Sequence, residues 1–306
     1  MLQTYHKYIV LCIAGQSNAV GYDESPVELS GLYDCQNPER IKQLGFYGED
    51  NLQLIPLSYC AQSMQDMRVH NNADTPTPGT KGLHLPLANL MLPYLPEDYG
   101  ILVLPISYGG TGFTCGSDGE YDDVLKKSSA PGPGEGTAIL KWGKGTAYYK
   151  TLRDRISYAL KLHPENKFAG IIWCQGENDD PAPKEHYTGF LEMTAALFTS
   201  LNEAGLGDRT AKGIFDKDIW YNMETVSYWY TLDGCVEIWN DYKKWNSDTY
   251  IEIPRDTDSN EMNGTGQTAR NRGAHFGNNS YATVIAPLVL KKLLERNAFP
   301  TSKEAE

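Results

Sequence analysis

Ser17 is the first residue of this chain whose type and position could do covalent chemistry. It stands in Gly15-Gln-Ser-Asn18, directly after the apolar run 8–14. Such a run is typical of a buried parallel strand, and the glycine permits a tight turn that lifts the serine to the carboxyl edge of the sheet. A serine there can be a nucleophile if a base and an oxyanion site meet it. The alternative is that Ser17 only caps a helix beginning at Asn18.

Two later blocks could stabilise a negative oxygen. One apolar run ends in Ser107-Tyr-Gly-Gly-Thr-Gly112, where adjacent glycines leave a backbone N–H free to donate. Another ends in Trp173-Cys-Gln-Gly-Glu-Asn-Asp179, where the amide of Gln175 is a side-chain donor. Each block also has a plain structural reading, as a glycine turn or as a polar loop that precedes a helix.

A base is expected at His275, in the segment Arg272-Gly-Ala-His-Phe-Gly-Asn278. This loop precedes the last predicted helix, and in a doubly wound sheet such a loop returns to the carboxyl edge. The other histidines lie at helix ends, in loops or at the opposite edge. The alternative is an ordinary surface histidine.

The elements that position these groups are apolar strands alternating with amphipathic helices, which predicts an α/β fold with a parallel sheet flanked by helices on both faces. We expect one domain over 1–306, elaborated by long loops at about 22–98, 114–146 and 216–272. The predicted strands are 8–14, 100–106 and 168–174, and the predicted helices are 148–162, 187–201 and 281–294.

Composition narrows the function classes. A net charge of −12 argues against nucleic acid as a partner. The six cysteines form no C-x-x-C pair, so zinc is unsupported and a reducing compartment is expected. The sequence shows neither a transmembrane stretch nor a signal peptide, so we expect no membrane partner and a cytoplasmic location. A phage-encoded protein or part of a larger secreted protein is the alternative, and the oligomeric state stays open.

Together these blocks resemble the SGNH hydrolase superfamily, in particular its sialate O-acetylesterase and carbohydrate-esterase branch. In that branch Gly-Gln-Ser-Asn carries the nucleophile, Gly-Gly-Thr/Ser and Trp-x-Gln-Gly-Glu blocks follow, and a late histidine is the base. All four elements occur here in that order, from residue 15 to residue 275. The chain is also similar to bacterial esterases that remove the 9-O-acetyl group of N-acetylneuraminic acid, at 41–44, 55–57, 64–67, 108–114 and 167–170.

The resemblance implies a three-layer, flavodoxin-like α/β sandwich and serine acyl transfer with no metal or cofactor. Ser17 would attack the acetyl carbonyl while His275 takes its proton. The oxyanion would be held by the N–H groups of Ser17 and Gly110 and by the Gln175 amide, with Gly109 as the alternative to Gly110.

One departure concerns the group that orients the base. Many members carry an aspartate three residues before the histidine, and this chain has Arg272 there. Either a Ser17–His275 dyad works with a backbone carbonyl, or a distant carboxylate substitutes, with Glu177 and Asp179 as the candidates.

The expected substrate is an O-acetylated sialic acid or a related acetylated glycan. Since a protein of charge −12 cannot attract a carboxylate over distance, a local arginine is expected, either Arg272 or Arg68. Each could instead be a solvated surface residue. Two other functions stay open: deacetylation of xylan or a bacterial surface polysaccharide, and non-catalytic glycan binding in a virion.

Overall fold

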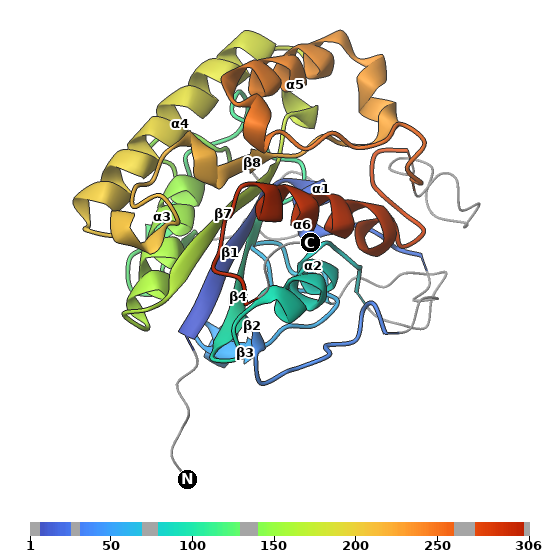
Figure 1. Cartoon of the computed structure of the whole chain (residues 1–306). Helices are drawn as coiled ribbons and strands as arrows, with labels where there is room; N and C mark the ends of the chain where they lie inside the picture. Colours follow the sequence, from blue (N-terminus) through green and yellow to red (C-terminus); the bar gives the residue numbers. More distant parts are fainter. Residues whose placement is uncertain (1–6, 26–30, 69–78, 129–139, 260–272, 303–306) are drawn as a thin grey trace.

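The computed structural model describes residues 7–25, 31–68, 79–128, 140–259 and 273–302. Its centre is a six-stranded sheet in the order β3-β2-β4-β1-β7-β8 (Figure 1). The strands of this sheet are β1 Lys7–Gly15, β2 Ile41–Leu44, β3 Leu54–Pro56, β4 Tyr99–Ser107, β7 Lys167–Cys174 and β8 Trp220–Asn222. The remaining two strands, β5 Tyr121–Asp122 and β6 Lys127–Ser128, form a separate small hairpin.

The sheet is mostly parallel, with one antiparallel edge. The pairs β2–β4, β4–β1, β1–β7 and β7–β8 are parallel, whereas β2–β3 is antiparallel. The predicted central parallel sheet is thus confirmed, and the edge strand β3 adds one antiparallel pair to it. The cause is the short connection through the turn Gly48–Asp50, because strands joined by a short turn pair antiparallel.

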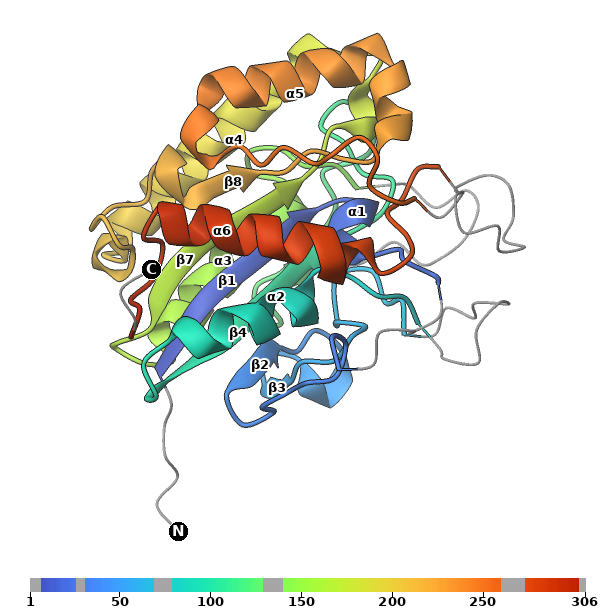
Figure 2. The same cartoon turned by 45° about the vertical axis from the view of Figure 1, so that its right-hand side comes forward.

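Helices cover both faces of the sheet, which confirms the predicted α/β sandwich. Figures 1 and 2 show α2 and α6 side by side on one face and α3, α4 and α5 on the other. The helices are α1 Ser17–Val20, α2 His84–Met91, α3 Ala147–Lys161, α4 Pro183–Glu203, α5 Asp233–Trp245 and α6 Ala286–Glu295, the last preceded by a π-helical turn, Tyr281–Ile285.

The core lies on the two faces of the central strands. In β1, Ile9, Leu11 and Ile13 belong to the cluster under α2 and α6. The alternate residues Val10, Cys12 and Ala14 belong to the cluster under α3, α4 and α5. Side chains alternate across a strand, so a strand buried on both faces must be apolar throughout. This explains the continuous apolar run before Ser17.

All three of the predicted long loops contain regular structure. Segment 22–98 includes β2, β3 and α2, and segment 216–272 includes β8 and α5. Segment 114–146 includes only the β5–β6 hairpin in its described part. Among the described residues, the helices lack a stretch of the length and apolarity that a membrane crossing requires.

Candidate active site

The carboxyl ends of β1, β4 and β7 meet at Gly15. In the register of the sheet, Gly15 stands opposite Ser107 on one side and Cys174 on the other. Its φ of +132° lies in the region that favours glycine, and a Cβ there would come within 2.0 Å of the Cys174 carbonyl oxygen. The chain can therefore turn sharply only with glycine at this position, and the turn leads straight into α1.

Ser17 is the first residue of α1, and it is 8% exposed. Gln16 occupies the capping position, and no side-chain cap is formed. Within the described residues, the Ser17 hydroxyl has no hydrogen-bond partner and its backbone N–H has no acceptor. The hydroxyl thus does not cap the helix, and it stands at the sheet edge without a competing contact.

The glycine block of β4 lies against Ser17. A Cβ placed on Gly109 would be 3.5 Å from Ser17 Cβ, which is ordinary contact, but only 2.8 Å from Gln65 Oε1, so a side chain here would displace Gln65. The Gly109 N–H donates to Gln65 Oε1 over 2.8 Å. The next residue, Gly110, is exposed with φ +74°, and no described residue accepts from its N–H. Of the two candidate oxyanion donors, Gly110 is the one whose N–H remains available.

The side chain of Gln175 is buried below the surface of the sheet edge. Its side chain is 1% exposed, and its Nε2 donates to the Thr111 carbonyl over 2.7 Å. Asn178 Nδ2 donates to the same carbonyl over 3.2 Å and also bonds to Gln16. The segment after β7 is therefore hydrogen-bonded, through Gln175 and Asn178, to Thr111 in the glycine block. A direct oxyanion contact from Gln175 would need its second amide hydrogen.

Asn18 ties the loop that carries His275 to the Ser17 turn. Its Nδ2 donates to the Ala274 carbonyl over 3.2 Å, and its Oδ1 accepts from the Phe276 N–H over 3.4 Å. The residues on both sides of His275 are therefore bonded to the residue after Ser17. His275 itself is 6% exposed.

A second connection runs from the glycine block to the imidazole. Gln65, which accepts from Gly109, donates through Nε2 to Tyr22 Oη over 2.6 Å. The Tyr22 ring stacks on His275 with centroids 4.6 Å apart and an interplanar angle of 26°. Burial raises the pKa of Tyr22 to about 12, so its hydroxyl keeps its proton at neutral pH.

A buried ion pair anchors the far end of the His275 loop. Lys81 and Asp23 are 2% and 0% exposed, with Nζ 3.7 Å from Oδ2. Lys81 Nζ donates to Asn279 Oδ1 over 2.6 Å, and the Asn279 N–H donates to Asp23 Oδ2 over 2.8 Å. Asn279 has φ +62°, a conformation that asparagine tolerates better than most residues. The pair is thus hydrogen-bonded to both the side chain and the backbone of Asn279.

The two candidate orienting acids have different partners. Glu177 Oε1 accepts from Asn18 Nδ2 over 3.0 Å and from Thr225 Oγ1 over 2.9 Å. Asp179 accepts from His186 Nδ1 over 2.5 Å, and His186 Nε2 lies 2.5 Å from Tyr242 Oη. Asp179 therefore orients a different, fully buried histidine. Glu177 reaches the His275 loop through Asn18, and in the described part of the chain it makes no hydrogen bond to His275.

The ionised form of Glu177 is energetically unfavourable at this buried position. Burial raises its pKa above the ordinary glutamate value, although hydrogen bonds from Asn18 and Thr225 oppose the shift. Its Oε2 is buried without a hydrogen-bond partner among the described residues. A buried carboxylate with an unsatisfied oxygen lowers the stability of the fold.

Glu177→Gln is therefore expected to raise the free energy of unfolding at pH 7 by about 1 kcal/mol, because the amide keeps the acceptor for Asn18 and removes the charge. The folded-state pKa of Glu177 is raised, so the wild type loses stability as pH rises through that pKa. The advantage of the variant should accordingly vanish as pH falls toward the ordinary value of 4.5. Denaturant unfolding at several pH values measures this, and Glu177→Ala is the control that loses the acceptor. A variant less stable than wild type at pH 7 would contradict it.

The structure describes only one of the two arginines that are candidates for binding the substrate carboxylate. Arg68 donates through Nε to Asp66 Oδ1 over 2.8 Å and through Nη2 to Asp66 Oδ2 over 2.7 Å. One bidentate edge of its guanidinium is thus already occupied, and the group lies 5.0 Å from the centre of the Tyr47 ring. Arg272 lies outside the described residues.

The residues that hold the site together are not among those predicted from the sequence. Asn18 could have been found, since it follows the nucleophile candidate directly. Tyr22, Gln65 and the pair Asp23–Lys81 stand in a segment without periodic pattern, and only their contacts identify them.

Comparisons with known proteins find carbohydrate esterases among the proteins similar to this chain. Residues 130–206 match the model of the carbohydrate esterase family of sialic acid-specific acetylesterases. The chain is 36% identical over 185 residues to the probable 9-O-acetyl-N-acetylneuraminic acid deacetylase of Escherichia coli K12. That alignment covers 56% of this chain and 53% of the relative, so the match spans about half of the relative's length.

Solved structures extend the comparison to nearly the whole chain. The crystal structure of NanS matches with a TM-score of 0.81 and 26% identity, covering 95% of this chain and 97% of that one. The X-ray structure of an Arabidopsis thaliana protein matches with a TM-score of 0.57 and 13% identity, over 94% of this chain and 98% of that one, which shows the fold alone. These matches confirm the predicted resemblance to the sialate O-acetylesterase branch of SGNH hydrolases.

Proposed function

We propose that this chain is a carbohydrate O-acetylesterase that removes the 9-O-acetyl group of N-acetylneuraminic acid through an acyl-enzyme on Ser17. The observation that carries the proposal is the bonding of Asn18 to both neighbours of His275, which joins the base loop to the nucleophile turn. The family match and the E. coli relative support the acetyl ester and the sialic acid as substrate.

In the proposed mechanism, Ser17 Oγ attacks the acetyl carbonyl carbon and His275 accepts the hydroxyl proton. The negative oxygen accepts from the N–H groups of Ser17 and Gly110, with Gln175 as the third donor. His275 then gives the proton to the departing sugar oxygen. Water attacks the acetyl-serine with His275 as base, which releases acetate and restores Ser17.

A substrate panel tests the proposal. We expect kcat/KM for 9-O-acetylated N-acetylneuraminate to exceed that for acetyl-xylooligosaccharide by about tenfold or more, as expected when a site is shaped for one sugar. Ser17→Ala is the control for contaminating esterases. A preference for the xylan fragment would reassign the substrate. Binding of the sialate without turnover by the wild type would instead support a glycan-binding module.

The same panel tests which arginine pairs with the substrate carboxylate. If Arg272 is the clamp, Arg272→Met should raise KM for the sialate by about tenfold, the effect of losing a charged hydrogen bond, and leave p-nitrophenyl acetate unaffected. Arg68→Met is the matched variant, for which we expect no change because Asp66 already occupies its bidentate edge. Equal losses on both substrates, or on neither, for both variants would remove the clamp and favour a neutral sugar ester.

A further inference from the structure

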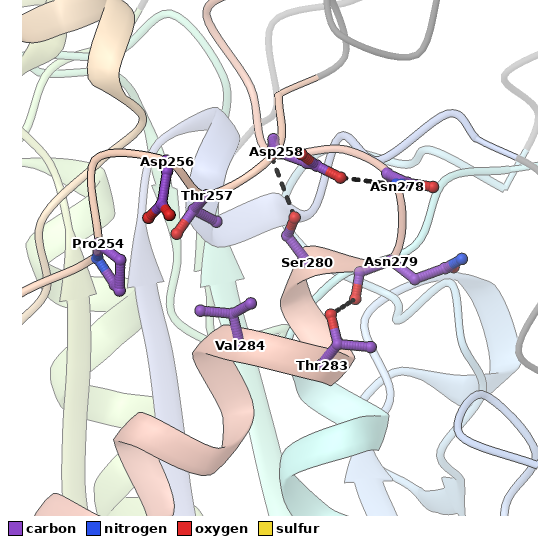
Figure 3. A pocket seen from close by; sticks show the side chains of 9 residues that line it. All are labelled: Pro254, Asp256, Thr257, Asp258, Asn278, Asn279, Ser280, Thr283 and Val284. Carbon is purple, nitrogen blue, oxygen red and sulfur yellow. Dashed lines mark hydrogen bonds between the residues drawn. The ribbon is translucent and has the colours of Figure 1, made fainter.

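The backbone around His275 is held on both sides. Asn18 bonds to the backbone of the residues directly before and after it. Farther along the loop, Asp258 Oδ2 accepts from Asn278 Nδ2 over 2.6 Å, and the Asp258 carbonyl accepts from Ser280 Oγ over 3.1 Å (Figure 3). These bonds place the backbone of His275, but they do not set the angle of its ring. The histidine torsion about Cβ–Cγ is broad, so the plane of the imidazole depends on a contact with its face.

The ring of Tyr22 makes that contact. It stacks on the imidazole of His275 with centroids 4.6 Å apart and an interplanar angle of 26°, the geometry of a favourable aromatic pair. A hydrogen bond at a ring nitrogen acts on the edge of the imidazole, whereas this stack acts on its face. The stack therefore resists tilting of the ring, whichever groups bond to its nitrogens.

The backbone of Tyr22 is held by the nucleophile turn and by the buried ion pair. The N–H of Gly21 donates to the Ser17 carbonyl over 3.0 Å, so the residue before Tyr22 is bonded to the nucleophile candidate. The residue after it, Asp23, forms an antiparallel bridge with Lys81, with N···O distances of 3.2 and 2.9 Å. The ring of Tyr22 therefore projects from a backbone whose position relative to Ser17 is fixed on both sides.

The hydroxyl end of Tyr22 is held by Gln65. Its Oη accepts from Gln65 Nε2 over 2.6 Å, while Gln65 Oε1 accepts from the Gly109 N–H over 2.8 Å. The backbone N–H of Gln65 donates to the carbonyl of Ser107, the last residue of β4, over 3.2 Å. The Gln65 side chain thus links the glycine block to the ring that stacks on the candidate base.

We propose that Tyr22 is a positioning residue for His275: its ring, held by Gln65, sets the plane in which the imidazole accepts the Ser17 proton. This role rests on the proposed function, in which His275 is the base. The face of the Tyr22 ring also attracts the imidazolium that forms when the proton arrives, because an aromatic face stabilises a nearby cation. That charge is present after proton transfer and not before it, so the contact should increase kcat and leave the binding of substrate unchanged.

Substitutions of Tyr22 separate the role of the ring from that of the hydroxyl. Tyr22→Leu removes the flat face, so kcat should fall about tenfold both with the 9-O-acetylated sialate and with p-nitrophenyl acetate, as for the loss of one aromatic pair. KM for p-nitrophenyl acetate should change by about twofold or less. Tyr22→Phe keeps the face and should keep kcat within about threefold of wild type, and Gln65→Met, a milder second variant, should lower kcat by a similar factor. Tyr187→Leu is the matched control and should leave kcat unchanged, because Tyr187 stacks on Phe190 within α4, with centroids 6.3 Å apart and an interplanar angle of 18°.

NMR of protein with labelled histidine tests the stack without relying on activity. The ring protons of His275 are identified, among those of the six histidines, by their absence from the spectrum of His275→Asn. In wild type they should be shifted upfield, because they lie over the face of an aromatic ring. The shift should disappear in Tyr22→Leu and persist in Tyr22→Phe. An unshifted wild-type resonance would overturn the stack and with it the positioning role.

The kinetic outcomes distinguish the positioning role from its alternatives. A loss confined to the sialate would make Tyr22 a substrate contact, and equal losses in Tyr22→Phe and Tyr22→Leu would assign the effect to the hydroxyl; either result overturns the role of the ring. An unchanged kcat in Tyr22→Leu, with His275→Asn inactive, would overturn the positioning role and leave the proposed function standing. Wild-type activity of His275→Asn would instead refute the proposed mechanism, and the positioning role would fall with it even if NMR showed the stack.

Discussion

Ser17→Ala is expected to lower kcat for acetyl-ester hydrolysis by about 10³-fold or more, as for other acyl-transfer nucleophiles. The melting temperature should change little. The Ser17 hydroxyl has no hydrogen-bond partner in the described part of the chain, so its removal leaves no other group unsatisfied. Steady-state kinetics and thermal unfolding of the purified variant measure both expectations.

Ser63→Ala provides the matched comparison. Ser63 is fully buried, and its hydroxyl bonds to the Ser107 carbonyl over 2.8 Å and accepts from the Ser107 N–H over 3.0 Å. This substitution should lower the melting temperature more than Ser17→Ala while lowering kcat far less. If Ser17→Ala kept wild-type activity, Ser17 would not be the nucleophile and the proposed mechanism would fall.

The central strands could be predicted because burial on both faces requires an apolar run. Segment 8–14 lies within β1, and the two other predicted strands lie within β4 and β7. The outer strand β2 reads Ile-Lys-Gln-Leu and gives no such signal. A short strand near the edge of a sheet can carry polar residues where a side chain reaches solvent, as Lys42 does, so its sequence does not distinguish it from a loop.

The positions of the candidate reactive residues at strand ends could be predicted, but the residues that support them could not. Ser17 and the glycine block follow strand ends, where the topology of a parallel sheet indicates a site. The pair Lys81–Asp23 is different, since buried charges are rare and sequence patterns do not reveal them. The contact of Lys81 with Asn279 spans 198 residues, a distance over which no local periodicity carries information.

His275→Asn is expected to lower kcat nearly as much as Ser17→Ala, because it removes the proton acceptor of the same step. The loop should keep its position, since Asn18 and the pair Lys81–Asp23 hold it through its backbone and through Asn279. His186→Asn is the matched control. His186 lies between Asp179 and Tyr242 at 2.5 Å from each, so this variant should lose stability rather than chemistry.

The double variant Ser17→Ala/His275→Asn separates a shared step from two independent roles. If the nucleophile and base act as a unit, the second substitution removes nothing that the first has left, so the double variant should have a kcat close to that of either single variant. Multiplicative losses would mean that His275 contributes to substrate binding by its stack on Tyr22 instead of to proton transfer. In that case His275→Asn would raise KM for the sialate and would change the ratio of the rates on the sialate and on the xylan fragment. The base would then be a residue of another element at this sheet edge.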